Sequence, residues 1–433
     1  MAEGTSAPAR HAPPRHLPCG YLSSCPMPKA VVLGAGMVGS VMALDLLGDA
    51  GWSVEIADVR AESLRAVRER GARQAGAKGK GSTLTSRAAD LSSAKEIKRL
   101  VRDADVVLGA LSSRIGLGAL KAVIEAGKPY SDISFMADDA GQFSALAQRK
   151  GVAAVVDMGV APGMSHLLAG HAVATLEECR AIEIYVGGLP RERRWPFDYK
   201  AAFSPADVIE EYTRPTRLVE HGREVVRPAL SEPELMDFDG VGTLEAFNTD
   251  GLRSLVRTLK VPFMKEKTLR YPGHIALMRA MRETGLFSSE PIAVRGPDGK
   301  TVNVRPLDLT STLMFPKWTY EPGEEDLTVM RVQADGRARG SKAACQLRWD
   351  LFDLYDRTSQ STSMARTTAL PCTIVARMLA AGQIRKRGVI FPEQLASQAG
   401  LVRHVLGALA AKGIVFREAH TGGVQAGGTR RRR

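Results

Sequence analysis

The chain has 433 residues and a net charge of +12, from 59 lysines and arginines against 47 aspartates and glutamates. With 44% hydrophobic and 24% charged residues, it has the composition of a globular protein with two or three domains. The four arginines at 430–433 supply 4 of the 12 excess charges, so the charge does not require nucleic-acid binding and equally suits an enzyme that attracts acidic cofactors or carboxylates.

The cysteines and the apolar segments indicate the cellular compartment and argue against certain metal sites and membrane spans. The five cysteines are odd in number and form no C-x-x-C pair, which argues against a disulfide framework or a cysteine zinc site and favours a reducing, cytoplasmic compartment. The longest apolar stretch, 30–44, contains three glycines and is shorter than a membrane span. The sequence therefore predicts no transmembrane segment and no metal site.

A β-branched run at 29–33 leads into the motif Gly34-Ala-Gly-Met-Val-Gly39, and a helix-spaced apolar segment follows it. Strand, glycine turn and helix in this order are typical of a dinucleotide-binding site. Gly34 permits the tight turn, Gly36 lets a pyrophosphate approach the backbone, and Gly39 lets the helix lie close to the strand. The pyrophosphate is then expected at the N-terminus of the helix.

The residue expected to bind the adenosine ribose is Asp58, which follows a second strand at 53–57. Its charge disfavours a 2′-phosphate, so NAD is the expected cofactor. Arg60 could bind a 2′-phosphate or stack on adenine, so NADP is not excluded. The expected cofactor-binding residues are Gly34, Ala35, Gly36, Met37, Val38, Gly39, Asp58, Val59, Arg60, Asp90, Leu111 and Ser112.

Strands and helices continue to alternate as far as residue 156, which predicts an α/β fold with a doubly wound parallel sheet, a Rossmann domain. The further expected strands are 84–88, 105–110, 129–133 and 152–156. Ligands of such sheets bind at the carboxyl ends of the strands, which directs Asp132 and Asp157 toward the cofactor crevice. Either residue could instead cap the helix that follows it.

From about residue 179 the pattern changes to shorter strands, such as 181–186, separated by turns rich in glycine and proline. This change predicts a second α/β domain with a mixed sheet. Two stretches in it, 245–251 and 265–274, combine charged, aromatic and turn residues, and we expect them to be substrate loops.

Helically spaced apolar residues at 372–379 and 401–409 predict C-terminal helices, and the short strand 413–417 follows them. The same ending occurs in winged-helix proteins, so a DNA-binding or nucleotide-sensing protein is the alternative from another class. A helix that packs on the first domain produces the same apolar stripe. A strongly salt-dependent affinity for DNA, lost on removal of the tail and last helices, would favour the alternative.

The chain accordingly divides into five expected parts. They are a disordered leader at 1–26, with Met27 as a possible start; a Rossmann domain at 27–157; a substrate-binding and dimerisation domain at 158–365; a helical segment at 366–420 that packs back on the Rossmann domain; and a disordered basic tail at 421–433.

Three motifs follow the glycine turn in order: Asp157-Met-Gly-Val-Ala-Pro-Gly-Met-Ser-His166, Thr268-Leu-Arg-Tyr-Pro-Gly-His274 and Pro371-Cys-Thr-Ile-Val375. Their combination resembles the saccharopine dehydrogenase family over about residues 29–417, with the lysine 6-dehydrogenase branch as the nearest likeness. The resemblance implies a two-lobed homodimer, or a higher homo-oligomer, whose middle region binds the substrate and forms the dimer contact.

For the lysine branch, the resemblance implies NAD-dependent oxidative deamination of the lysine ε-amine to 2-aminoadipate 6-semialdehyde, which cyclises to piperideine-6-carboxylate. A saccharopine dehydrogenase or a related C–N reductase is the alternative, and His166 is more similar to saccharopine reductases. In both cases the partner is a small amino-acid substrate, without a membrane and without nucleic acid.

This chemistry needs a proton acceptor near the nitrogen and a cationic or N–H-rich group for the α-carboxylate. The motifs supply Asp132, His166, Tyr271 and His274 as candidates for proton transfer or amine orientation. Arg253, Arg270 and Gly163 are the candidates for substrate binding. His166 could equally be a core histidine.

Overall fold

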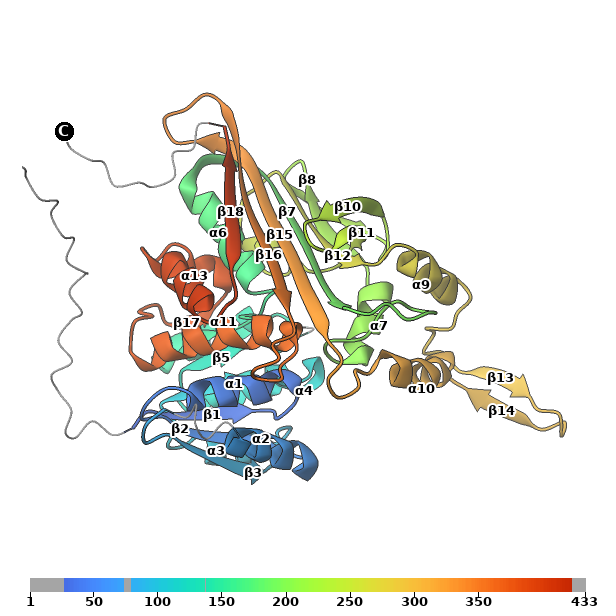
Figure 1. Cartoon of the computed structure of the whole chain (residues 1–433), viewed down its shortest axis with the longest axis horizontal. Coiled ribbons are helices and arrows are strands. Elements are labelled where there is room, and N and C mark those ends of the chain that lie inside the picture. The colour runs from blue at the N-terminus through green and yellow to red at the C-terminus, as the bar shows by residue number, and fades with distance from the viewer. Residues whose placement is uncertain (1–26, 74–78, 137, 423–433) are drawn as a thin grey trace, which may run out of the picture.

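Two lobes, each built on its own β-sheet, make up the computed structural model (Figure 1). The structure describes residues 27–73, 79–136 and 138–422. The expected leader at 1–26 and the expected tail from residue 423 onward lie outside these residues. None of the helices within the described ranges is long and apolar enough to cross a membrane.

The first lobe has a parallel sheet of seven strands in the order β17-β6-β5-β4-β1-β2-β3. Their bounds are β1 (Lys29–Leu33), β2 (Ser53–Asp58), β3 (Thr83–Ala88), β4 (Val106–Gly109), β5 (Tyr130–Asp132), β6 (Ala153–Val155) and β17 (Gly388–Ile390). Six of these strands were expected. The seventh, β17, comes from the C-terminal segment and pairs with β6, and three residues are too few to show a periodic pattern.

Helices cover both faces of this sheet, because alternate strand residues point to opposite sides. Val32 belongs to the core beneath α1, whereas Val31 belongs to the core beneath α3 and α4. The helices are α1 (Met37–Leu47), α2 (Ala61–Arg73), α3 (Ala94–Leu100), α4 (Ser113–Glu125), the 3₁₀ turn η2 (Ala140–Phe143) and α5 (Ser144–Arg149). The C-terminal helix α11 (Ser363–Ala380) packs beside α1 and over β4 and β5 (Figure 1).

The second lobe is built on a mixed sheet of nine strands, in which β7 and β12 are parallel and the other pairs antiparallel. Along the sheet the order is β10-β11-β12-β7-β15-β16-β18. Strand β8 lies off this order and pairs with both β12 and β9. The bounds are β7 (Leu176–Pro190), β8 (Thr216–Glu220), β9 (Arg223–Arg227), β10 (Glu234–Phe238), β11 (Gly242–Asn248), β12 (Phe263–Arg270), β15 (Asp326–Ala338), β16 (Ala344–Leu354) and β18 (Phe416–Thr421).

Three expectations are corrected by this sheet. The two stretches expected to be substrate loops are mostly the strands β11 and β12 and the turns that follow them. The C-terminal segment also contributes β17, which was not expected, and the short strand expected at 413–417 is β18, which begins and ends a few residues later. Because β18 pairs antiparallel with β16 through Thr421, it is an edge strand of the large sheet and not the wing of a DNA-binding motif, and Thr421 does not begin a tail.

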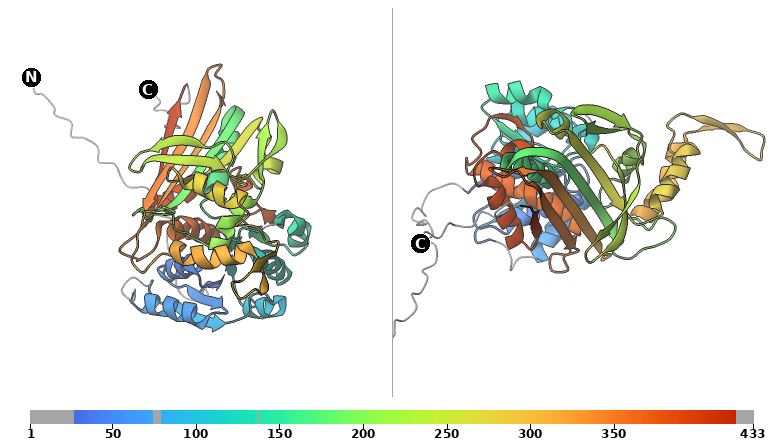
Figure 2. Two further views of the ribbon diagram at one scale, coloured as in Figure 1. Left: turned by 90° about the vertical axis from the view of Figure 1, so that its right-hand side faces the viewer. Right: turned by 90° about the horizontal axis from the view of Figure 1, so that it is seen from above.

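The remaining helices surround the second sheet and join the lobes. They are α6 (Met164–Thr175), α7 (Pro205–Thr213), α8 (Leu255–Thr258), α9 (His274–Glu283), α10 (Pro306–Trp318), α12 (Pro392–Leu395) and α13 (Leu401–Ala411). Helix α6 contacts β7 and β15 on one side and α12 on the other. A two-stranded hairpin, β13 (Ile292–Arg295) and β14 (Thr301–Val304), projects from the second lobe beyond α10 (Figure 2).

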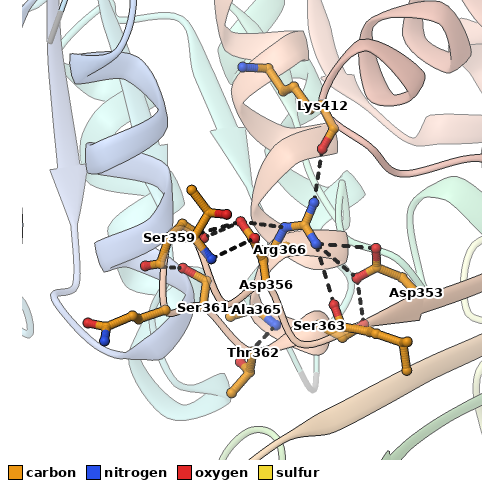
Figure 3. A network of polar contacts seen from close by, with 12 residues as sticks. Asp353, Asp356, Ser359, Ser361, Thr362, Ser363, Ala365, Arg366 and Lys412 are labelled. Carbon is orange, nitrogen blue, oxygen red and sulfur yellow. Dashed lines mark hydrogen bonds and ion pairs between the residues drawn. The ribbon is translucent and has the colours of Figure 1, made fainter. Parts of the chain in front are cut away.

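A polar network holds the connection from β16 to α11 (Figure 3). Asp353 accepts a hydrogen bond from the Ser363 hydroxyl at 2.7 Å and pairs with Arg366 at 3.3 Å. The Thr362 side chain caps α11 by accepting a hydrogen bond from the Ala365 N–H. Arg366 also donates to the carbonyl of Lys412. The start of α11 is therefore fixed both to the second sheet and to the segment that ends α13.

Candidate functional site

The glycine turn at 34–39 has the geometry that a pyrophosphate site needs. Gly34 has φ +103°, and a Cβ there would lie 2.3 Å from the Ala110 carbonyl oxygen. A Cβ on Gly39 would lie 1.9 Å from the Gly34 carbonyl oxygen, so both positions require glycine. At Gly36 the nearest atom to a Cβ would be Arg60 Nη2 at 3.9 Å, which leaves open space at the N-terminus of α1. These residues fit a dinucleotide pyrophosphate.

Asp58 is at the end of β2, as expected, but its carboxylate holds the glycine turn. Oδ2 accepts the Ala35 N–H at 2.7 Å, and Oδ1 accepts the Arg60 N–H at 2.9 Å. The side chain is 10% exposed, whereas the Arg60 side chain, paired with it at 3.4 Å, is 55% exposed. The cation is therefore the more accessible of the two charges where an adenosine ribose is expected. Val59, between them, is exposed.

The other expected cofactor residues lie at the same edge of the sheet. Asp90, after β3, accepts hydrogen bonds from the Ser92 side chain and N–H, which lower its pKa. The Leu111 N–H donates to the Ser134 hydroxyl, and Ser112 is the N-cap residue of α4. Met37 and Val38 are in the first turn of α1.

Asp132, a candidate for proton transfer, is fully buried at the end of β5. Its carboxyl accepts hydrogen bonds from the Tyr130 hydroxyl and from the N–H and hydroxyl of Ser134, at 2.8 to 3.0 Å. Burial raises its pKa to about 7. Since Gly109 packs directly against this carboxyl, Asp132 ties neighbouring strand ends together inside the core.

His166 and Gly163 are at the start of α6, in the junction between the lobes. The His166 ring is 1% exposed, with Nδ1 next to the Ser165 hydroxyl and Nε2 3.1 Å from the Leu252 carbonyl. Because a carbonyl only accepts, Nε2 carries the proton, and burial lowers the pKa of the ring to about 3. Gly163 has φ +134° and packs against Gly159. Both residues hold the chain turn that follows β6.

The motif 268–274 forms a buried cluster in the second lobe. Arg270 lies over the ring of Tyr199, with 4.3 Å from Cζ to the ring centre, and donates to the Tyr212 hydroxyl. Tyr212 in turn contacts His274 Nε2 at 2.9 Å, and His274 Nδ1 lies 2.8 Å from the Phe197 carbonyl.

The side chains of this motif are occupied by protein partners. Burial lowers the pKa of His274 to about 3, so the ring is neutral. The Tyr271 hydroxyl donates to the Pro190 carbonyl. Arg270 also pairs with Glu211 of α7 at 2.9 Å, and the Glu211 side chain reaches the space between the lobes.

A pocket of about 60 Å³ lies between the two lobes. The first lobe supplies residues that follow β5 and β6, and the second lobe supplies α7, β7 and the neighbourhood of β11 and β12. The lining residues are Phe135, Ala161, Pro162, Val186, Asp207, Glu210, Glu211, Arg214, Thr249, Asp250, Gly251, Glu266 and Thr268. Five of these side chains are carboxylic acids and one is a guanidinium, so the pocket is acidic.

The acid most enclosed in this pocket is Glu266, on β12. It is 4% exposed, and its Oε2 accepts the Thr249 hydroxyl at 2.5 Å. Burial raises its pKa to about 8. The sequence placed residue 266 in a candidate substrate stretch, but nothing in its local pattern distinguished it from neighbouring charged residues. The register of β12 against β7 and the loop after β11 decide its surroundings.

Phe135 lies between two arginines at the rim of the pocket. Arg253, a substrate-binding candidate, has its Cζ 4.1 Å from the centre of the ring, and Arg214 has its Cζ 6.0 Å away. Arg253 also pairs with Asp157 at 3.2 Å and donates to the Met136 carbonyl. Its donors are therefore shared with the first lobe, and Asp157 is part of a contact between lobes rather than a helix cap.

The structure thus separates the expected site residues into four places. The expected cofactor residues gather around the glycine turn and the neighbouring strand ends, and Asp132 is in the core of the first lobe. Arg270, Tyr271 and His274 are in the core of the second lobe, and His166, Gly163 and Arg253 are at the junction. None of the seven catalytic and substrate-binding candidates lines the pocket itself. Within the described ranges, no group of three or more His, Cys, Asp or Glu is arranged to hold a metal ion.

Two family models match consecutive parts of the chain. The saccharopine dehydrogenase NADP binding domain matches residues 30–155, and the saccharopine dehydrogenase C-terminal domain matches residues 159–414. A solved structure of saccharopine dehydrogenase (L-Glu forming) from Saccharomyces cerevisiae superposes with a TM-score of 0.73 at 17% identity, covering 91% of this chain and 100% of that chain. The fold of the two lobes is therefore that of the yeast protein.

Curated relatives are similar over most of the chain. Alpha-aminoadipic semialdehyde synthase from Mus musculus is 22% identical over 386 residues, which cover 74% of this chain and 41% of the synthase. Saccharopine dehydrogenase [NADP(+), L-glutamate-forming] from Schizosaccharomyces pombe is 21% identical over 387 residues, which cover 71% of this chain and 83% of the relative. The chain spans about two fifths of the length of the mouse synthase.

Proposed function

The chain belongs to the saccharopine dehydrogenase family, and from this premise we propose that it is an NAD(P)-dependent oxidoreductase that acts on the C–N bond of a secondary amine joining two amino acids. The names of the relatives from mouse and fission yeast support this substrate class. They favour it over oxidation of the lysine ε-amine, which the sequence motifs alone suggested.

The observation that carries the proposal is the acidic pocket between the lobes. Its first-lobe wall follows the carboxyl ends of β5 and β6, the edge at which ligands of doubly wound sheets bind. Its second-lobe wall presents Asp207, Glu211 and Glu266. Carboxylates suit a substrate that carries protonated nitrogens, because charge-assisted hydrogen bonds to ammonium groups are the strong ones.

The glycine turn and the N-terminus of α1 are the proposed pyrophosphate site, with Asp58 and Arg60 at the adenosine end. When bound, NAD(P)⁺ accepts as hydride the hydrogen of the carbon next to the substrate nitrogen. The protein supplies the binding surfaces and must move one proton from the nitrogen.

Arg214 is the proposed ligand of a substrate carboxylate. It is the cation among the lining residues, its side chain is 29% exposed, and its ion pair is with Glu210, an acid of the same pocket that is itself 47% exposed. Arg270 is enclosed by aromatic rings, and the donors of Arg253 are shared with Asp157 and Met136, so both act through the packing around the pocket.

The test is turnover by the purified full chain with saccharopine or L-lysine, each with NAD⁺ or NADP⁺, at mildly alkaline pH. We expect reduced cofactor and an amino-acid semialdehyde from saccharopine. Ammonia released from lysine, with no turnover of saccharopine, would contradict the proposal in favour of a lysine 6-dehydrogenase. Turnover of neither substrate would overturn both the proposed function and the lysine 6-dehydrogenase alternative.

A variant tests the role of Arg214. Arg214→Met should raise the KM for the amine at least tenfold, about the effect of one lost charge-assisted contact, and leave the Kd for NADPH unchanged. Arg99→Met, on the exposed surface of α3, is the matched control and should change neither constant. Equal changes in KM and cofactor Kd would contradict a carboxylate contact.

A further inference from the structure

We propose that Glu266 is the residue that exchanges a proton with the substrate nitrogen, with Thr249 and Thr268 as the hydroxyls that position its carboxyl. The inference rests on the proposed function, because it assigns a role within the same pocket. The residues that the sequence suggested for this role, Asp132, His166, Tyr271 and His274, do not line the pocket.

The register of the second sheet directs Glu266 and Thr268 to the same side. Both are on β12, two residues apart, and β12 pairs in parallel with β7 so that Glu266 lies beside Ile184 and Thr268 beside Val186. Side chains two apart on a strand share a face. Thr268 and Glu266 both line the pocket.

Two threonine hydroxyls form a short chain to the carboxyl. Thr249 Oγ1 is 2.5 Å from Glu266 Oε2 and 2.8 Å from Thr268 Oγ1. A hydroxyl has one proton, so when Glu266 is ionised Thr249 donates to it and Thr268 donates to Thr249. These two hydroxyls hold Oε2 of Glu266, and Glu266 lines the pocket.

The loop after β11 closes tightly on the same carboxyl. A Cβ on Gly251 would lie 2.3 Å from both Cδ and Oε2 of Glu266, so a larger residue there would displace the carboxyl. Across the pocket are Phe135, Ala161 and Pro162 of the first lobe, which carry no charge. The carboxyl is therefore enclosed by the protein except toward the pocket, where the substrate binds in the proposed function.

The charges around Glu266 favour its protonated form. Burial is the largest cause of its raised pKa, and the carboxylates of Glu211 on α7 and Asp250 after β11 add to it, whereas the Thr249 hydroxyl opposes it. The pocket also contains Asp207, Glu210 and the guanidinium of Arg214. A carboxyl group that titrates near pH 8 accepts and returns protons efficiently at physiological pH.

The step itself is a proton transfer. In the direction of oxidation, an N–H bond of the substrate ammonium breaks, an O–H bond forms on Glu266, and the nitrogen keeps the electron pair. In the direction of reduction, the protonated carboxyl returns that proton to the nitrogen. No other group is oxidised or reduced in this step.

The decisive measurement is the pH dependence of kcat/KM for Glu266→Gln, with saccharopine as the amine. We expect the wild type to show a limb with an apparent pKa near 8 in the oxidation direction. We expect Glu266→Gln to lose about 10²- to 10⁴-fold in kcat/KM and to lose that limb, with NADPH affinity unchanged.

Glu393→Gln is the matched control. Glu393 on α12 is also a buried acid, 5% exposed, and its Oε1 accepts the Thr258 hydroxyl at 2.6 Å, but it does not line the pocket. Its substitution should leave the pH limb in place. If Glu266→Gln keeps more than a third of the wild-type kcat/KM with the same limb, the inference is wrong.

Thr249→Val provides a second variant that leaves the carboxyl in place. Because the Thr249 hydroxyl lowers the pKa of Glu266, its removal should move the limb to higher pH. An unshifted limb would overturn the inference even if Glu266→Gln failed to fold. A wild-type enzyme inactive on every amine tested would instead contradict the proposed function.

Discussion

Arg60 and Asp58 place a cation and a carboxylate at the adenosine end of the proposed cofactor site. Both Asp58 oxygens accept backbone N–H groups, whereas Arg60 is largely free to reach a ligand. We predict that Arg60→Ala weakens NADPH binding about tenfold and NADH binding less than threefold, measured by fluorescence titration. Arg65→Ala, exposed on α2, should alter neither. Equal losses would mean that Arg60 only supports the turn.

The buried ring of His274 is expected to make the free energy of unfolding depend on pH. Its folded pKa of about 3 lies below the ordinary value of 6.5, so the native state binds fewer protons than the unfolded state between these values. The free energy of unfolding therefore falls as the pH falls through this window, by up to about 1.4 kcal/mol per pH unit.

His274→Asn, which retains a donor for the Phe197 carbonyl, should reduce this acid sensitivity by about 1 kcal/mol per pH unit. Urea unfolding between pH 6.5 and 4.5 measures the slope. An unchanged slope would show that His274 is protonated in the folded state. His166, buried with a similarly lowered pKa, accounts for a slope that remains.

At the scale of elements, we expect two glycines of the turn at 34–39 to have different roles, Gly39 in folding and Gly36 in cofactor binding. A Cβ at Gly36 would touch only Arg60 Nη2, at an ordinary contact distance of 3.9 Å, whereas a Cβ at Gly39 would lie 1.9 Å from the Gly34 carbonyl oxygen. We predict that Gly36→Ala leaves the melting temperature within a few degrees and weakens NADPH binding at least tenfold, because the methyl occupies the approach of the pyrophosphate. Gly39→Ala should lower the melting temperature markedly. Calorimetry gives the melting temperature of each variant, and titration gives its affinity for NADPH. Normal NADPH binding by Gly36→Ala would contradict the proposal that the pyrophosphate binds at this turn.

The strands β11 and β12 show why local sequence misjudged the second lobe. Their charged residues looked like loop residues, yet ion pairs and hydrogen bonds satisfy them: Lys267 pairs with Glu234 at 2.8 Å and Glu266 with Thr249. Strand propensity reflects how a side chain packs on a half-buried sheet surface. It therefore does not recognise a strand whose charged side chains find partners elsewhere in the fold. The element that carries the acidic pocket could therefore not be assigned from its own residues.

At the scale of the whole molecule, α11 connects the C-terminal segment to the first lobe. Arg377 pairs with Asp45 of α1 at 2.8 Å, and Lys412 pairs with the same carboxylate at 2.6 Å. Burial opposes ionisation of Asp45, but the two cations outweigh it and hold its pKa below the usual value.

We predict that Arg377→Met lowers the free energy of unfolding by about 2–4 kcal/mol at pH 7, because it leaves a buried carboxylate with one partner fewer. The stability that depends on ionised Asp45 is present above its unfolded pKa of 3.8 and is lost as the pH falls through its lower folded pKa. The difference between variant and wild type should therefore shrink at acidic pH. Chemical unfolding at pH 7 and pH 3 checks this, and a difference that is the same at both values would assign the effect to packing alone.

The sequence by itself determined the parallel sheet of the first lobe, the glycine turn, the acid at the end of β2 and the family. Each of these depends on local order: a strand, a turn that only glycine can form, and a helix follow one another within a few tens of residues. The sequence also predicted that the expected cofactor residues lie close together, because the carboxyl ends of parallel strands share an edge.

Only the tertiary structure decided which polar residues face the pocket. Asp132, His166 and His274 have the right chemistry in sequence, but each is buried with protein partners. Glu266 has no distinguishing neighbour in sequence, and β17 reaches the first sheet from more than 200 residues beyond β6. Burial and long-range pairing depend on all elements at once, and no window of the sequence contains them.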